Sequence, residues 1–123
     1  MKHSPGFLKL VGSVKKLVRQ INIAKVMAKL RARRPFYFID VREDHEWAKG
    51  HCPGAMHVGR GILERDIEAL IPDRKAEIVL YCGGGFRSAL AAESLGKMGY
   101  KNVLSMAGGF RGWVSRRGRV VKP

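Results

Sequence analysis

A cysteine followed at once by three glycines, a phenylalanine, an arginine and a serine is the segment best suited to chemistry. It runs from Cys82 to Ser88 and directly follows the apolar residues Ile78–Tyr81. Glycine backbone can turn sharply and aim successive N–H groups into a small anion-binding hollow. A helix that begins near Arg87 would add the partial charge of its N-terminus, and Arg87 itself a full positive charge. These surroundings favour the thiolate of Cys82, the nucleophilic form of cysteine.

A tight turn is the simpler explanation of the same residues, with Cys82 as a small apolar side chain at the end of a buried strand. Three glycines, followed by arginine and serine at a helix start, favour the nucleophile instead. Nucleotide-binding loops fit poorly, because Ser88 stands where the dinucleotide fingerprint requires glycine and the chain contains no Gly-Lys-Ser/Thr sequence.

Strands and helices alternate along the chain around this loop. Continuous apolar runs at 36–39 and 78–81 are typical of strands buried on both faces. Apolar spacing predicts further strands at 55–58 and 102–105 and helices at 7–18, 23–32, 44–48, 61–71, 87–98 and 108–115. This alternation predicts one α/β domain with a mostly parallel, open sheet flanked by helices on both faces. Ligands of such sheets bind beyond the carboxyl ends of the strands, where Cys82 falls.

The formal charge of +14 is concentrated at the two ends of the chain. Residues 1–34 carry ten basic residues and residues 111–123 carry five, without acidic ones, and the middle is close to neutral. A basic surface attracts anions, including small sulfur oxyanions, nucleic acid or an acidic protein. No aromatic-rich nucleic-acid motif accompanies the charge, so we expect no nucleic-acid partner, while an acidic protein partner stays open.

The basic amphipathic pattern at 7–18 allows two roles: a helix packed on the domain, or a helix lying on an anionic membrane surface. Gly12 and the short length favour packing. The first residues do not resemble a signal peptide, and no apolar run approaches membrane-spanning length. Two cysteines, Cys52 and Cys82, do not make a disulfide framework, so we expect a cytoplasmic protein without membrane attachment.

Four motifs resemble those of the rhodanese family, in its order and spacing. They are Asp40-Val41-Arg42-Glu43 with Glu46-Trp47, Gly50-His51-Cys52-Pro53-Gly54-Ala55, Cys82-Gly83-Gly84-Gly85-Phe86-Arg87-Ser88 and Gly108-Gly109-Phe110-Arg111-Gly112-Trp113. The resemblance covers about residues 20–117. It implies a rhodanese domain at 20–117, with a basic extension at 1–19 before it and a basic tail at 118–123 after it.

The resemblance also implies a mechanism. The Cys82 thiolate would take a sulfane sulfur from thiosulfate or a persulfide, become a persulfide, and pass the sulfur to a thiol or to cyanide. Backbone N–H groups of the loop would bind the substrate, and the loop residues are Gly83, Gly84, Gly85, Phe86, Arg87 and Ser88. Neither a metal nor an organic cofactor is required, and the oligomeric state stays open.

Two other activities are weighed against sulfur transfer. The related cell-cycle phosphatases have five residues between cysteine and arginine, whereas this chain has four, which makes phosphatase or arsenate reductase chemistry the less favoured enzyme activity. The alternative of a different class is a non-catalytic binding or sulfur-carrier module, whose basic ends dock an acidic partner or RNA while Cys82 only carries sulfur.

Several residues outside the loop qualify these expectations. Cys52 replaces a usually aliphatic residue of the family, and we expect it to fill the same apolar pocket, although a resolving role stays open. Arg87 is the single cation of the loop, so thiosulfate recognition would depend on residues elsewhere or be weak. Asp40, Arg42 and Glu46 are interpreted as structural ion pairs rather than as acid–base catalysts.

Overall fold

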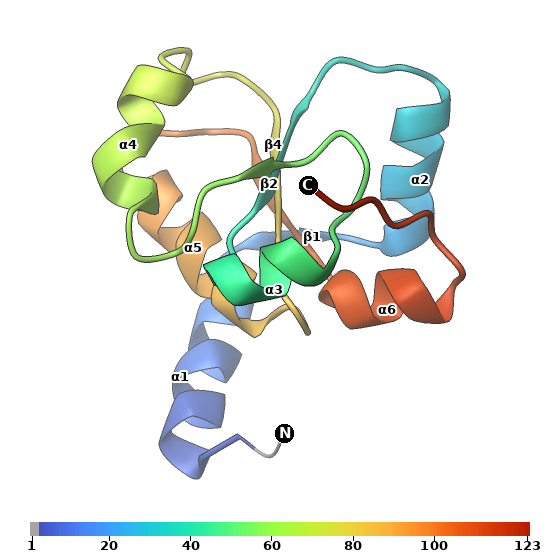
Figure 1. Cartoon of the computed structure of the whole chain (residues 1–123). Coiled ribbons are helices and arrows are strands. Elements are labelled where there is room, and N and C mark those ends of the chain that lie inside the picture. Colours follow the sequence, from blue (N-terminus) through green and yellow to red (C-terminus); the bar gives the residue numbers. More distant parts are fainter. Residues whose placement is uncertain (1–2) are drawn as a thin grey trace.

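Five parallel strands form the centre of the molecule (Figure 1), which is described by a computed structural model covering residues 3–123. The strands are β1 (Arg19–Ile21), β2 (Tyr37–Asp40), β3 (Met56–His57), β4 (Ile78–Tyr81) and β5 (Val103–Met106). Their order in the sheet is β1-β5-β4-β2-β3, and each pair of neighbours is parallel. The predicted α/β architecture with a parallel sheet is confirmed.

Six helices surround this sheet in the described residues: α1 (Pro5–Lys15), α2 (Ile23–Arg31), α3 (Asp44–Lys49), α4 (Leu63–Leu70), α5 (Phe86–Lys97) and α6 (Gly109–Ser115). One core contains Ile67 of α4 and Leu95 of α5. The other contains Val26 of α2 and Trp113 of α6. The two pairs of helices therefore cover opposite faces of the sheet (Figure 1). Helices on both faces were predicted and are confirmed.

Strand β1 is an element that the sequence did not predict. Its three residues form no apolar run, since Arg19 and Gln20 are exposed and Ile21 alone is buried. The strand forms at the edge of the sheet by pairing with β5, opposite Leu104 to Met106. This long-range pairing leaves no local pattern in the sequence. The predicted boundary between residues 19 and 20 falls within the strand, and the domain limits stay predictions.

Helix α1 packs on the domain through part of its apolar side. Val11 and Val14 are buried, and the helix contacts α5. Leu10 and Leu17, which share the predicted apolar pattern, are 52% and 74% exposed. Packing on the domain therefore accounts for Val11 and Val14, whereas Leu10 and Leu17 of the same predicted apolar pattern stay exposed to solvent. No helix in the span from 3 to 123 has the length and apolar character needed to cross a membrane.

The loop after β4 lies directly against the start of α6. The backbone N–H of Phe110 donates to the carbonyl of Cys82 at 2.8 Å, and that of Arg111 donates to the carbonyl of Gly83 at 3.0 Å. Gly109 has a φ of +56°, and a Cβ at this position would lie 2.5 Å from the Cys82 carbonyl oxygen. Glycine is therefore required for the two segments to meet.

Alanine substitutions at two glycines test this close approach. We expect Gly109→Ala to lower the free energy of unfolding by about 2–4 kcal/mol, because it combines a left-handed φ with a backbone clash. Gly96→Ala in α5 is the control: no atom lies within 4 Å of its added Cβ, so stability should rise by about 0.5–1 kcal/mol. Urea denaturation measures both. A Gly109→Ala protein as stable as the unmodified chain would contradict this packing.

Candidate active site

A cavity opens at the carboxyl edge of the sheet, where neighbouring strands send their connections to opposite faces. Strand β4 leads into α5 on one face, and β5 leads into α6 on the other. A crevice at such a switch point is the usual ligand site of an open parallel sheet. Here the cavity measures about 860 Å³ and is lined by Cys82 and its loop, together with residues after β2 and from α1 and α6. We call it the Cys82 cavity.

The sulfur of Cys82 lies among main-chain N–H groups. Gly85 N–H donates to Sγ at 3.1 Å, and Ser88 N–H at 3.4 Å. The thiol faces the Ser88 hydroxyl at 3.5 Å, and that hydroxyl lies 2.8 Å from Oγ of Ser105. Gly85 adopts a φ of +96°, a conformation that glycine adopts without strain. The loop therefore presents an amide cradle to the sulfur, as its three glycines predicted.

Further amides of the same loop are available to a ligand. Among residues 3–123, the backbone N–H groups of Gly83, Gly84, Phe86 and Arg87 donate to no acceptor. Cys82 itself is 1% exposed, although it lines the cavity. A reagent therefore reaches the sulfur through the cavity, and the four residues whose N–H groups lack an acceptor line the same cavity.

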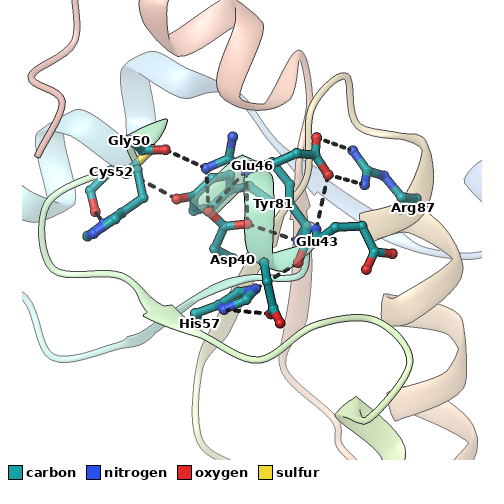
Figure 2. A network of polar contacts seen from close by, with 11 residues as sticks. Asp40, Glu43, Glu46, Gly50, Cys52, His57, Tyr81 and Arg87 are labelled. Atoms are coloured by element: carbon teal, nitrogen blue, oxygen red, sulfur yellow. Dashed lines mark hydrogen bonds and ion pairs between the residues drawn. The ribbon is translucent and has the colours of Figure 1, made fainter. Parts of the chain in front are cut away.

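Arg87 pairs with a carboxylate of α3. Its Nη1 and Nη2 donate to Oε1 and Oε2 of Glu46 at 2.7 and 3.1 Å, as Figure 2 shows. The hydrogen bonds from Arg87 lower the pKa of Glu46 to about 2. The full positive charge expected from Arg87 is therefore largely offset.

Asp40 and Arg42 form a second ion pair, which is buried. Asp40 is 0% exposed and Arg42 is 4% exposed. Arg42 Nη2 donates to Asp40 Oδ2 at 2.8 Å and to the carbonyl of Gly50 at 2.7 Å. Through these contacts the pair ties the end of β2 to the loop after α3, at Asp40 and Gly50, which are labelled in Figure 2. Both ion pairs agree with the structural role expected for Asp40, Arg42 and Glu46.

Comparison with known proteins decides the family. The family model "Rhodanese-like domain" matches residues 22–116. The chain belongs to the rhodanese-like domain family. "Putative sulfurtransferase YtwF" of Bacillus subtilis is 35% identical over 78% of this chain and 90% of its own length. "Thiosulfate sulfurtransferase GlpE" of Coxiella burnetii is 30% identical over 66% of this chain and 74% of its own.

Solved structures agree with this rhodanese-like assignment. A rhodanese-related protein from Thermoplasma volcanium matches with a TM-score of 0.74 and 28% identity, over 85% of this chain and 99% of that one. A Rhodopseudomonas palustris protein, described as of unknown function and a possible tyrosine phosphatase, matches with a TM-score of 0.87 and 26% identity over 98% of both chains. The family model and the relatives named sulfurtransferases indicate a transferase that acts in sulfur transfer in general, between a sulfur donor and an acceptor.

Helix α1 forms one wall of the Cys82 cavity in this rhodanese-like domain. Sequence reasoning did not predict this position of the helix. The ring of Phe86 lies 4.6 Å from His3 and 6.1 Å from Phe7, measured between ring centroids. Lys15 Nζ lies 4.6 Å from the centroid of the same ring. The apolar pattern of 7–18 indicated that the helix packs, but nothing in the sequence indicated on which residue.

Cys52 lies in the core on the face of the sheet covered by α2 and α6, whereas Cys82 belongs to the opposite core. Both cysteines are free. Burial raises the pKa of the Cys52 thiol to about 12, so this thiol is neutral. The surroundings fit the apolar packing role expected of it. Within residues 3–123, no three His, Cys, Asp or Glu side chains gather in a way that could hold a metal ion.

The Glu46–Arg87 pair generates a pH-dependent prediction. Because the folded pKa of Glu46 is about 2 and its ordinary value is 4.5, the pair stabilises the fold fully above pH 4.5 and loses its effect as pH falls toward 2. At pH 7, Glu46→Gln should lower the free energy of unfolding by about 1–3 kcal/mol, between the values for exposed and buried pairs.

Urea denaturation of both proteins from pH 7 to pH 2.5 measures this difference. The gap between the unmodified chain and Glu46→Gln should narrow below pH 4.5. Glu93→Gln serves as the control, because Glu93 lies 3.7 Å from an exposed Lys97 and should contribute less than about 0.5 kcal/mol. A gap that stays constant down to pH 2.5 would show that the ion pair does not cause it.

The α1 wall predicts how accessible Cys82 is. Phe7→Ala should open the cavity and speed alkylation of Cys82 by a bulky maleimide several-fold, with a smaller effect on iodoacetamide, because thiol reactivity depends on access. Leu8→Ala on the same helix is the control, since Leu8 is 45% exposed. Equal rates for all three proteins would mean that α1 does not limit entry.

Proposed function

We propose that this domain moves a sulfane sulfur from thiosulfate or a persulfide donor to a thiol or cyanide acceptor, through a persulfide on Cys82. The observation that supports it most is the position of Sγ, which receives the N–H groups of Gly85 and Ser88 at the floor of a cavity. Amides held at fixed positions stabilise a sulfur anion without the reorganisation that water would need.

Two displacements make up the proposed cycle. In the first, the Cys82 thiolate attacks the outer sulfur of thiosulfate; a new S–S bond forms, and the old S–S bond breaks with its electron pair leaving on sulfite. In the second, cyanide attacks the terminal sulfur, the Cys82 S–S bond breaks, and thiocyanate leaves while the thiolate is restored. A thiol acceptor, reacting as its thiolate, takes the sulfur as its own persulfide.

The backbone of the loop would act in both steps. The N–H groups of residues 83, 84, 86 and 87 have no acceptor among residues 3–123, and these residues line the cavity that the terminal sulfur would enter. They would share the negative charge of the persulfide, in the manner of an oxyanion hole with sulfur in place of oxygen. No metal or cofactor enters this scheme.

Phosphatase chemistry is the other activity to test, because one structural relative is described as a possible tyrosine phosphatase. Four residues separate Cys82 from Arg87, and Arg87 donates both outer nitrogens to Glu46. Glu46 therefore occupies the Nη1–Nη2 edge of this guanidinium and competes with a phosphate ester for its donors. We therefore expect no hydrolysis of para-nitrophenyl phosphate.

Mass spectrometry of the intact protein tests the proposal. Incubation with thiosulfate, or with glutathione persulfide, should add about 32 Da (one sulfur atom) to the chain, and cyanide should remove it as thiocyanate. Cys82→Ser should gain nothing. Cys52→Ala should behave as the unmodified protein, because Cys52 is buried in the other core.

Turnover separates an enzyme from a sulfur carrier. Repeated thiocyanate formation with excess thiosulfate supports the enzyme, whereas a single adduct that only a protein acceptor can discharge would favour the carrier. No adduct from either donor, or equal labelling in Cys82→Ser, would refute the role of Cys82.

A further inference from the structure

Arg111 is the arginine of the Cys82 cavity that no carboxylate neutralises. Three arginines line the cavity, Arg42, Arg87 and Arg111. Arg42 is paired with Asp40, and Arg87 with Glu46. In the described part of the chain, no carboxylate lies within ion-pairing distance of Arg111.

The guanidinium of Arg111 lies over the bare backbone of Gly84, inside the Cys82 loop. A Cβ on Gly84 would overlap Nη2 of Arg111 and would lie 3.3 Å from its Cζ. The Arg111 backbone is fixed as well, since its N–H donates to the Gly83 carbonyl at 3.0 Å. A positive charge is thus held beside the loop, on the side of the cavity that faces solvent, because Arg111 is exposed whereas Cys82 is buried.

An anionic sulfur donor has two parts that the cavity must accommodate, the transferable sulfur and the charged group that carries it. The transferable sulfur must reach Sγ at the floor, so the rest of the molecule points toward the mouth. In thiosulfate that other end is a sulfonate group, which carries its charge on three oxygens. A guanidinium matches two such oxygens with two parallel N–H donors. The sequence placed only Arg87 in the loop as a cation, and Glu46 occupies it.

From these contacts we infer that Arg111 is the specificity-determining residue for the donor. Its guanidinium binds the oxyanion end of a thiosulfate-type donor while Cys82 attacks the outer sulfur. In that step the S–S bond of the donor breaks and its electron pair leaves on sulfite, so the charge beside Arg111 grows as the reaction proceeds. This inference rests on the proposed sulfur transfer and adds to it the residue that recognises an anionic donor.

Donor kinetics of Arg111→Gln test the inference. We expect kcat/KM for thiosulfate to fall about 10–100-fold, mostly through KM, the range expected for losing hydrogen bonds to a charged group. The rate with an uncharged dialkyl trisulfide should change less than about twofold, because that donor carries no oxyanion. Arg111→Lys should recover part of the loss, since lysine keeps the charge without the fork.

Arg116→Gln is the matched control. Arg116 is an exposed arginine at the end of α6, the helix that contains Arg111, and it does not line the Cys82 cavity. Its substitution should leave both donors unaffected. An Arg111→Gln protein with unchanged kcat/KM for thiosulfate would overturn the inference, and so would an equal loss with the uncharged donor, which would indicate a damaged loop.

A binding measurement keeps this test separate from the proposed function. Calorimetry of thiosulfate with Cys82→Ser measures anion binding without any transfer. Binding that weakens about 10-fold or more when Arg111→Gln is added supports the inference even if transfer fails. Equal binding by the two proteins, or none by either, counts against it even if Cys82 forms a persulfide.

Discussion

The close contact between the Cys82 loop and the start of α6 is the constraint on which the site depends. The carbonyls of Cys82 and Gly83 accept the N–H groups of Phe110 and Arg111, so they face α6 and not the sulfur. The remaining amides of the loop are then free to turn inward, and those of Gly85 and Ser88 reach Sγ. The contact requires glycine, because any Cβ at Gly109 would meet the backbone of the loop.

Ion pairing then decides what kind of positive potential the sulfur experiences. Asp40 and Glu46 engage Arg42 and Arg87, so neither guanidinium contributes its whole charge to the cavity. The sulfur of Cys82 is left to main-chain dipoles, which are fixed by the fold and lie at hydrogen-bonding distance. Such dipoles act strongly in a site that excludes water, and they need no reorganisation when charge moves between sulfur atoms. The ion pairs themselves tie α3 to the loop and to the end of β2, which supports the cradle.

Local sequence signals were enough to predict the sheet, its helices and the cradle, because each of them leaves a pattern within a few residues. The apolar runs before Asp40 and Cys82 marked the strands, and three glycines marked the loop. Contacts between distant residues were not predictable in this way. Arg87 meets Glu46 across 41 positions, β1 exists only because β5 accepts it, and Arg111 reaches Gly84 from another helix. Spacing along the chain contains no information about such pairs. Sequence reasoning therefore missed that Glu46 offsets the charge of Arg87, and that Arg111 lies beside the loop without a carboxylate partner in the described residues.

The uneven distribution of charge along the chain can be related to these contacts. The segment that contains the loop is close to neutral, and the basic residues belong to the two ends. One basic residue of each end lies beside the Cys82 loop: Lys15 of α1 lies over Phe86, and Arg111, the first residue of the basic C-terminal segment, lies over Gly84. Under the proposed function, these cations would attract an anionic donor over a distance that salt shortens, while the neutral amides next to Sγ would hold the sulfur. It is favourable that attraction of the donor and binding of the sulfur are performed by different groups. A strong cation next to Sγ would lower the nucleophilicity of a Cys82 thiolate by stabilising it.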